Sequence, residues 1–365
     1  MRTARQSRRG AFTLVELLIV IAIISILAGL VTAGVFQFIG RQRLHNTEAL
    51  IKTVDETLRA HWTKVIEEAK KELGIPQEVV SLAGGDQSLA RILWIKIRLV
   101  EAFPMTYYEA AYPPRYYDHN SKVWVDLIPF NRRRYFTEYA AKLNFNPSTL
   151  PTISPFAPNR ETESAACLLA ALSISRGGAP ALNLDLLPIP PLDTDGDGNK
   201  EIVDGWGNAI AFFRFPTVNL DLQSSNPAPK NSSGNPTLTD TMDPKFQLVG
   251  GWWSSNGNLN RWRFQEVCRF TLGDGSTPEN PREWYTRPVI VSKGADGVLG
   301  LKLLEASVPA PPIQPPNAPL PPNPTMHNVN LAIPAYDYPD MSLLNPLNPV
   351  GVKDNIYSFK LGAPQ

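Results

Sequence analysis

The sequence predicts an α+β protein, in which a long N-terminal membrane-spanning helix packs on a head that combines an antiparallel β-sheet with inserted helices. Three observations support this fold class. An apolar run with a single charge extends from Phe12 to about Ile39. A helical stripe of apolar residues continues beyond that run, and short segments rich in β-branched and aromatic residues follow in the second half of the chain.

The apolar run is long enough to cross a membrane, because about 20 apolar residues span a bilayer core. Four arginines and no acidic residue precede the run, and this basic flank keeps the N-terminus on the cytoplasmic side. An ordinary secretory signal has a shorter apolar core that ends in a small-residue cleavage site. We therefore expect a single membrane-spanning helix over residues 12–40, with the chain that follows it outside the cytoplasm.

The helical pattern does not stop at the membrane edge. Gly74 and Pro76 provide the first clear stop signal, so one helix of about 93 Å is expected from Phe12 to Leu73. Its second half, residues 41–74, is amphipathic. The apolar positions recur at steps of three and four residues: Leu50, Val54, Leu58, Trp62, Val65 or Ile66, Ala69 and Leu73.

Glu16 is the most informative residue of the apolar run. A carboxylate inside an apolar helix is costly unless it finds a partner, and such residues usually have a function. The simpler alternative is that Glu16 reaches the lipid headgroups from the end of the span. The surrounding segment 10–24 begins Gly-Ala-Phe-Thr-Leu-Val-Glu and continues with apolar residues. It resembles the N-terminal methylation segment of type IV prepilins and pseudopilins.

This resemblance implies a processing site and an assembly contact. Prepilin peptidase would cut between Ala11 and Phe12 and methylate the new amine. Glu16, then the fifth residue of the mature chain, would offset the N-terminal charge of a neighbouring subunit in the assembled filament. The family usually has Gly directly before the cut, where this chain has Ala11. Cleavage after Gly10 is therefore the alternative.

The head contains one acidic segment with metal-ligand spacing. Oxygen-bearing side chains stand at positions one, three, five and twelve of a loop with Gly at position six, which is the spacing of an EF-hand loop. Lys200 at position eight and the short Asp204 at position twelve depart from that pattern. An isolated calcium loop is the preferred interpretation, and an acidic surface turn is the alternative. The predicted Ca²⁺ ligands are Asp193, Asp195, Asp197, Asn199 and Asp204.

Two further segments of the head resemble the major pseudopilin of type II secretion systems. Residues 204–208, Asp-Gly-Trp-Gly-Asn, resemble the segment that opens the β-sheet in that family. Residues 288–297 resemble its last major strand and the loop that follows. The resemblance implies a second calcium site, with Ser292, Asp296 and Asp354 as ligands.

Other segments have simpler local patterns. Helices are expected at 88–103 and 161–173, and strands at 246–250, 267–272 and 287–292. Arg132 to Arg134 form a charge run, for which a solvated helix face is a better interpretation than a binding patch. An aromatic loop is expected at Tyr107, Tyr108, Tyr112, Tyr116 and Tyr117.

These patterns divide the chain into consecutive segments. They are a leader peptide (1–11), the transmembrane and polymerisation helix (12–40), its amphipathic continuation (41–74), a mostly helical insertion (75–190), the calcium loop and β-sheet of the head (191–300), a Pro-rich insertion (301–353) and a C-terminal segment (354–365). The prolines of the insertion are typical of a stiff, extended spacer.

Composition and motif content argue against an enzyme and against a nucleic-acid partner. The formal net charge is +1, so bulk electrostatics does not favour nucleic acid. The four histidines are scattered, and no His-Glu-x-x-His, Gly-x-Ser-x-Gly or phosphate-binding loop is present. Cys167 and Cys268 match no metal spacing, and a disulfide and two buried thiols are the alternatives for them.

The resemblance implies a structural pseudopilin-type subunit. Such a subunit is held by a single pass in the cytoplasmic (inner) membrane, with its head in the periplasm or outside, and assembles into a periplasmic filament for type II-like protein secretion. Its partners are the membrane, prepilin peptidase, other copies and related pseudopilins, and the inner-membrane assembly platform. A type IV pilus subunit and a membrane-anchored, calcium-dependent surface-binding module are the alternatives.

Overall fold

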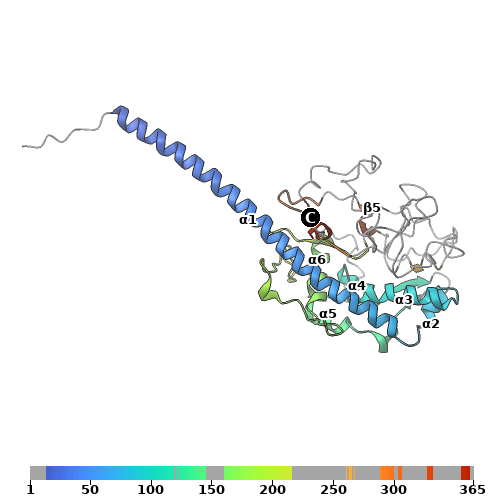
Figure 1. Ribbon diagram of the computed structural model, residues 1–365. Coiled ribbons are helices and arrows are strands. Elements are labelled where there is room, and N and C mark those ends of the chain that lie inside the picture. The colour runs from blue at the N-terminus through green and yellow to red at the C-terminus, as the bar shows by residue number, and fades with distance from the viewer. Residues whose placement is uncertain are drawn as a thin grey trace, which may run out of the picture. The chain divides into compact units, whose positions relative to one another are not determined.

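The computed structural model describes residues 14–118, 121, 123–144, 160–215, 260, 263–264, 267, 288–299, 303–305, 327–331 and 355–361 (Figure 1). The chain divides into two compact units, Met1–His45 and Asn46–Gln365. The first unit contains the N-terminal part of one long helix. The second is the head, an α+β unit in which helices accompany small antiparallel sheets. This agrees with the predicted fold class.

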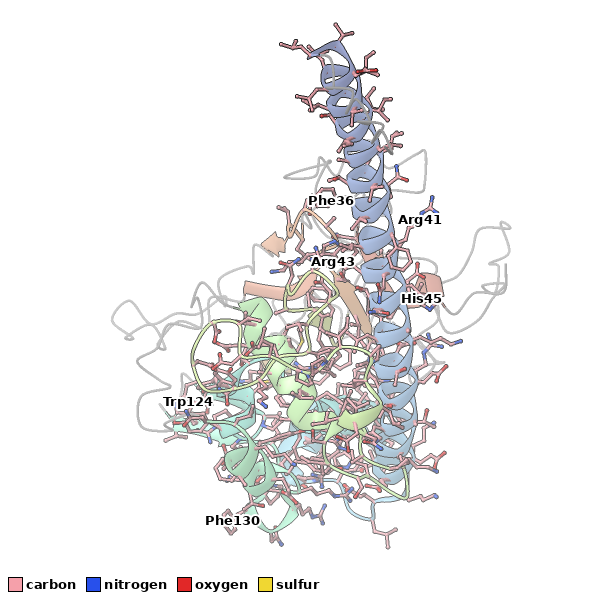
Figure 2. All side chains as sticks on the ribbon, turned by 90° about the vertical axis from the view of Figure 1, so that its left-hand side faces the viewer. Phe36, Arg41, Arg43, His45, Trp124 and Phe130 are labelled. Atoms are coloured by element: carbon pink, nitrogen blue, oxygen red, sulfur yellow. The ribbon has the colours of Figure 1, made fainter. Side chains whose placement is uncertain are left out.

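Helix α1, Leu14–Lys71, is continuous over 58 residues. All residues from 14 to 45 are exposed, and large apolar side chains project from this stretch, among them Phe36, which is 70% exposed (Figure 2). Two of its polar side chains are satisfied within the helix, since the hydroxyls of Ser25 and Thr32 donate to carbonyls four residues earlier. A helix that is apolar all round requires an apolar environment.

Within the head, α1 buries one stripe of side chains. The stripe contains Leu50, Val54, Leu58, Trp62, Val65 and Ala69, each at most 4% exposed, as the three- and four-residue spacing predicts. The Trp62 ring lies 5.1 Å from the Phe103 ring and 5.9 Å from the Phe215 ring, centroid to centroid. Each large apolar side chain buried in this way contributes about 1.5–3 kcal/mol.

The end of α1 differs slightly from the prediction. The helix stops at Lys71, and Leu73, which was expected to extend the stripe, is 90% exposed. The chain turns at Gly74, whose φ of 68° suits a residue without Cβ. Arg91 donates to the carbonyls of Ala69 and Glu72 at 3.1 and 2.8 Å. It thereby satisfies backbone acceptors that the helix end leaves without partners.

A mostly helical region follows α1. It contains α2 Gln77–Leu82, α3 Gln87–Ala102, α4 Tyr107–Ala111, the 3₁₀ turn η1 Phe130–Arg132, α5 Phe136–Lys142, α6 Arg160–Leu172 and the 3₁₀ turn η2 Leu184–Leu186. The helices expected at 88–103 and 161–173 are α3 and α6. Thirteen of the sixteen residues of α3 are buried, which makes it the central helix of the core.

A β-hairpin interrupts the helices where none was predicted. Strands β1 Arg115–Asp118 and β2 Val123–Asp126 pair antiparallel. The tyrosines that were expected in one aromatic loop are therefore divided, with Tyr107 at the start of α4 and Tyr116 in β1. At the exposed edges of this region, Trp124 and Phe130 are 36% and 82% exposed (Figure 2).

A three-stranded antiparallel sheet completes the described core. Its order is β3 Ala211–Phe213, β4 Val289–Ser292, β7 Ile356–Tyr357, and Phe212 pairs with Ile290. Helix α6 contacts β3, where the Phe212 N–H donates to the Ser164 hydroxyl. The short helix α8, Ser358–Leu361, follows β7. All residues of β3 and β4 are buried.

The remaining strand predictions have different outcomes. The strand expected at 287–292 is β4, whereas the one expected at 246–250 lies outside the described residues. Of 267–272 only Val267 is described, and it is helical. Within the predicted Pro-rich insertion, β5 Leu303–Glu305 and β6 His327–Leu331 pair antiparallel, and the prolines between them lie outside the described residues.

Candidate functional site

The N-terminal site residues lie at the beginning of α1. Glu16 is in the first turn of the helix, where a carboxylate also interacts favourably with the helix dipole. Ala11 and Phe12, the predicted processing site, lie outside the described residues. Among the described helices, α1 is long and apolar enough to cross a membrane, and its most apolar stretch is not buried within the protein.

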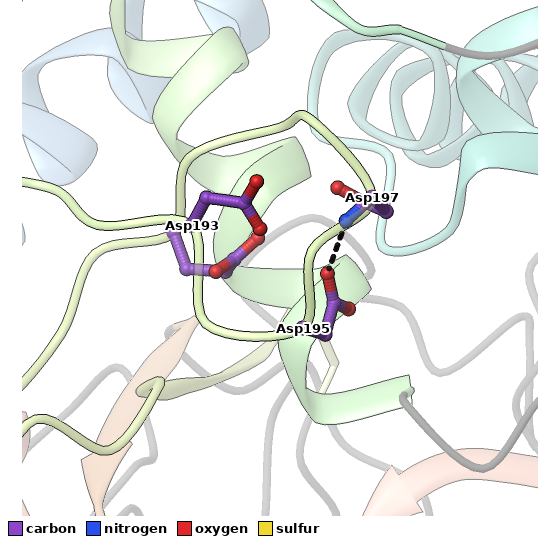
Figure 3. A group of neighbouring side chains, drawn as sticks. Asp193, Asp195 and Asp197 are labelled. Carbon is purple, nitrogen blue, oxygen red and sulfur yellow. Dashed lines mark hydrogen bonds between the residues drawn. The ribbon is translucent and has the colours of Figure 1, made fainter.

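The acidic loop brings four carboxylates together. One oxygen each from Asp193, Asp195, Asp197 and Glu201 lies within 4.8 Å of all the others, and Figure 3 shows the three aspartates around the loop. Glu201 was not among the predicted ligands. It stands at position nine of the loop, a position that contributes to the ion in EF-hands, often through water, so the spacing contained a signal for it.

Backbone pairing holds this loop in shape. Leu192 and Glu201 exchange both of their backbone hydrogen bonds, at 3.0 and 2.9 Å, and so close the loop at its base. Gly196 and Gly198 have φ values of 79° and 89°, which glycine adopts without strain. The Asp193 carboxylate accepts hydrogen bonds from the backbone N–H groups of both glycines, at 2.7 and 3.1 Å.

Glu201 is the most buried member of the group, with 0% of its surface exposed. Its Oε2 accepts from the backbone N–H of Thr194 at 2.6 Å and from the Thr194 hydroxyl at 2.8 Å. Its Oε1 is buried and has no hydrogen-bond partner. Burial raises the pKa of Glu201, and the neighbouring Asp195 and Asp197 raise it further, against the effect of the Thr194 hydrogen bonds.

Two contacts attach the loop to the helical region. The Tyr107 hydroxyl, at the start of α4, donates to Asp197 Oδ2 at 2.6 Å. Asn144, after α5, donates its backbone N–H to Asn199 Oδ1 at 2.5 Å and its side-chain amide to the Asp197 carbonyl at 3.2 Å. The Asn199 side chain, a predicted ligand, thus binds Asn144. Burial and the Asp197 hydrogen bond raise the pKa of Tyr107.

Asp204 lies outside the acidic group. Its Oδ1 accepts from the backbone N–H groups of Trp206 and Asn208 at 2.9 and 3.0 Å. Its Oδ2 accepts from the Ser292 hydroxyl on β4 at 2.8 Å. The Asp-Gly-Trp-Gly-Asn segment is therefore a turn, pinned by its first aspartate to the strand that pairs with β3.

The second predicted site is not assembled among the described residues. Ser292 is fully buried, and its hydroxyl is engaged by Asp204 and by the Gly294 backbone N–H. Asp296 accepts from the Val298 backbone N–H at 2.8 Å. Asp354 lies outside the described residues. Ser292 and Asp204, which the sequence assigned to two different calcium sites, thus bind each other, and ligation by either remains a prediction.

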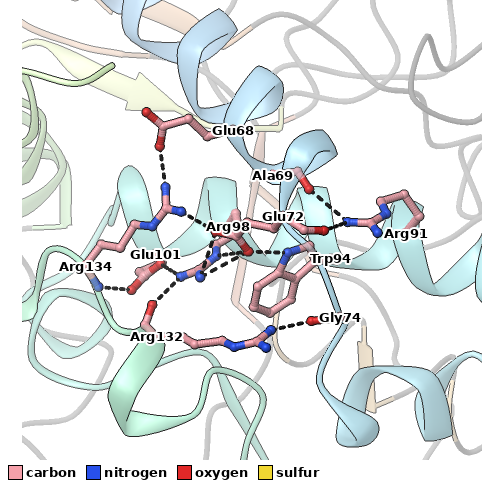
Figure 4. Close-up of polar contacts among 10 residues, drawn as sticks. All are labelled: Glu68, Ala69, Glu72, Gly74, Arg91, Trp94, Arg98, Glu101, Arg132 and Arg134. Carbon is pink, nitrogen blue, oxygen red and sulfur yellow. Dashed lines mark hydrogen bonds and ion pairs between the residues drawn. The ribbon is translucent and has the colours of Figure 1, made fainter. Parts of the chain in front are cut away.

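The arginine run is neither a solvated face nor an open binding patch. Arg133 forms an ion pair with Asp126 at 2.7 Å, and Arg134 contacts Glu68 of α1 and Glu72, which directly follows α1 (Figure 4). Arg132 donates to the Gly74 carbonyl. The prediction of a solvated helix face is wrong, because these side chains bind acidic and carbonyl groups of β2, of α1 and of the turn that follows α1.

Behind this run lies a buried ionic network. Arg98 of α3 is 4% exposed and forms ion pairs with Glu72 at 3.0 Å and with Glu101 at 2.6 Å. Trp94 donates its indole N–H to Glu72 at 2.7 Å. Burial raises the pKa of Glu101, while Arg98 and Arg134 act to lower it. The network fastens α3 to the end of α1 (Figure 4).

Cys167, one of the two cysteines, is buried and free. It lies on α6 with 0% of its surface exposed, and burial raises the pKa of its thiol well above the usual value. Cys268 lies outside the described residues.

Comparison with known proteins identifies the N-terminal segment. Residues 6–32 match the family model described as the prokaryotic N-terminal methylation motif. No curated protein and no solved structure matches the chain. The motif, together with the long helix that begins within it at Leu14, identifies the N-terminal part of this chain as type IV prepilin-like.

Proposed function

We propose that the protein is a structural subunit of a pilin-like filament, and specifically a pseudopilin-type subunit of a type II-like secretion system. The observation that carries this proposal is the methylation motif at residues 6–32 joined to a helix that continues without a break to Lys71. An apolar helix of this length suits a subunit that is anchored in the membrane and carries a folded head.

The exposed part of α1 explains why assembly follows anchoring. Its apolar side chains require lipid before assembly and neighbouring subunits afterwards, because a surface of this kind is unfavourable in water. Processing between Ala11 and Phe12 by prepilin peptidase creates a charged amine in an apolar environment. The Glu16 carboxylate of a neighbouring copy offsets that charge, and the pair sets the register between subunits.

The secretion role is supported by the turn at Asp204. It resembles the turn that opens the sheet of the major pseudopilin, and here Asp204 fastens that turn to Ser292 of β4. The Asn208 amide also donates to the Gly294 carbonyl at 3.2 Å. In this proposal the head lies on the periplasmic side of the inner membrane.

Replacing Glu16 by Leu tests the assembly contact. Membrane insertion is retained, because removing a charge from the span favours insertion, while assembly is lost because the amine has no partner. Assembly is measured by cysteine or amine cross-linking of membranes from cells that express the full chain with prepilin peptidase. The matched control is Glu56→Leu, at an exposed position of α1 in the head, which leaves the cross-linked ladder intact.

Two results would overturn the proposal. One is a normal ladder for Glu16→Leu, and the other is assembled protein that keeps its full N-terminus instead of a methylated Phe12 by intact-mass analysis. Deletion of the gene separates the secretion role from a pilus. Loss of secreted proteins with surface fibres intact supports the pseudopilin, and the reverse result supports a pilus subunit.

A further inference from the structure

We propose that Asp193, Asp195, Asp197 and Glu201 bind one Ca²⁺ ion in the head, with Glu201 in place of Asp204 as the fourth carboxylate. The proposal is independent of the filament function, since it concerns the head alone. It also differs from the set Ser292, Asp296 and Asp354, because none of those residues belongs to the group.

The observation that points to a ligand is the Oε1 atom of Glu201. This atom has no hydrogen-bond partner, and the residue is fully buried, with 0% of its surface exposed. A buried carboxylate oxygen without a partner is costly, and the protein holds it in place by fixing Oε2 through two hydrogen bonds from Thr194. The carboxylate of Glu201 faces three aspartates, so a cation is the partner that this arrangement suits.

The charge of the group leads to the same conclusion. Four carboxylates with oxygens within 4.8 Å of one another repel when ionised. The repulsion becomes attraction when a divalent cation occupies the centre. Glu201 is held beside the aspartates by its backbone pairing with Leu192.

The chemistry of the ligands selects calcium. All four side chains offer oxygen, which hard cations prefer, and none offers the sulfur or imidazole nitrogen typical of zinc. Calcium–oxygen distances of about 2.3–2.6 Å place opposite ligands about 4.6–5.2 Å apart. All four oxygens lie within 4.8 Å of one another, so no pair is too far apart to share one calcium ion. Mg²⁺ demands near-ideal octahedral geometry and usually keeps several of its waters, so a set of four protein carboxylates suits it less well than calcium.

The site also has a structural consequence. On one side, the Tyr107 hydroxyl and the Asn144 amide of the helical region donate hydrogen bonds to Asp197. On the other side, the chain continues from Glu201 to Asp204, which binds Ser292 of the sheet. An ion at the loop therefore joins the helical region to the sheet. Binding to the folded state alone stabilises the whole head, and the gain grows with calcium concentration.

The test is calcium titration of the full chain in detergent, with thermal unfolding and equilibrium dialysis as readouts. The wild-type chain binds one Ca²⁺ per chain, and its midpoint of unfolding rises as calcium is added. In Glu201→Gln the affinity falls by at least about tenfold. With EGTA present, the same variant unfolds at a temperature equal to or above that of the wild type, because one buried charge is gone. A variant that binds calcium more weakly and yet is at least as stable as the wild type without calcium has lost a ligand, not its fold.

Asp204→Asn and Asp296→Asn are the matched controls, since each removes one carboxylate charge outside the group. Both bind calcium with wild-type affinity. The proposal is overturned if the wild type binds no calcium up to about 10 mM, or if Glu201→Gln binds as tightly as the wild type. It is also overturned if Asp296→Asn or Asp204→Asn abolishes binding. Equal affinity for Mg²⁺ would overturn the assignment to calcium.

Discussion

The two halves of α1 have the same secondary structure and opposite environments. Leu30 in the first half is 66% exposed, whereas Leu58 in the second is fully buried. Both are leucines in the middle of a continuous helix, so neither helix propensity nor residue type explains the difference. The second half finds its apolar partner within the head, and the first half must find its partner outside the chain.

The comparison also distinguishes two kinds of pattern. Beyond Asn46, apolar residues recur every three or four positions, and these positions form the buried stripe. From Leu14 to about Ile39 the apolar residues cover every side, and no single stripe can be selected. A helix apolar on all sides is typical of a membrane span or of the core of a helical assembly.

The largest expected effect concerns the polar contacts that hold the buried half of α1. In Arg98→Met, Glu72 and Glu101 lose the cation that lies between them, and breaking a buried ion pair costs about 3–5 kcal/mol. Unfolding of the full chain in detergent by urea, followed by tryptophan fluorescence, measures the loss. Lys70→Met, at an exposed position, is the control and changes stability by less than about 0.5 kcal/mol. Wild-type stability for Arg98→Met would show that the network adds nothing.

A pair of leucine substitutions tests the comparison itself. Leu58→Ala removes buried methyl groups and leaves a cavity, so the head loses about 2–5 kcal/mol of unfolding free energy. Leu30→Ala leaves the unfolding of the head unchanged, because Leu30 is exposed in the N-terminal unit. Urea unfolding followed by tryptophan fluorescence measures the unfolding free energy of both variants. If Leu30→Ala destabilised the head as much as Leu58→Ala, the distinction between the two halves would fail.

A smaller effect concerns His61, a buried polar residue on the head half of α1. Its Nε2 donates to the Pro180 carbonyl at 2.7 Å, and the Arg176 guanidinium lies 3.1 Å from its Nδ1. Burial lowers the pKa of His61, with Arg176 acting in the same direction. Below about pH 6.5, His61 therefore becomes protonated in the unfolded chain while it stays neutral in the folded chain.

Stability of the head consequently falls as the pH is lowered through that window. The loss ends once the pH is below the folded-state pKa of His61. Urea unfolding at closely spaced pH values measures it. His61→Gln removes the His61 contribution to the pH dependence, whereas His45→Gln, at an exposed position, keeps it. An unchanged pH profile for His61→Gln would show that the buried imidazole does not titrate as argued.

Short-range patterns in the sequence were sufficient for much of the fold. The apolar run, the stripe from Leu50 to Ala69 and helices α3 and α6 follow from local periodicity, because each buries a face that the spacing defines. The unexpected hairpin of β1 and β2 shows the limit of this approach. Its tyrosines carry no alternation strong enough to separate a strand from an aromatic loop, and only pairing with β2 decided between them.

The arginine run illustrates why charge patterns are ambiguous. Three consecutive arginines are typical of a solvated surface, yet Arg134 contacts Glu68 and Glu72, more than sixty residues earlier in the chain. No spacing rule connects positions so far apart. The partner of a long charged side chain is set by which elements pack nearby.

The membrane-spanning helix, the acidic residue in its first turn and the gathering of Asp193, Asp195 and Asp197 could all be predicted without the fold. They depend only on composition and on spacing within one segment of the chain. That Glu201 joins the three aspartates while Asp204 lies elsewhere is seen only in the folded chain. Backbone pairing with Leu192 turns Glu201 toward the aspartates. Asp204 is instead drawn to Ser292, 88 residues away on β4, since a carboxylate buried beside a hydroxyl takes that hydrogen bond.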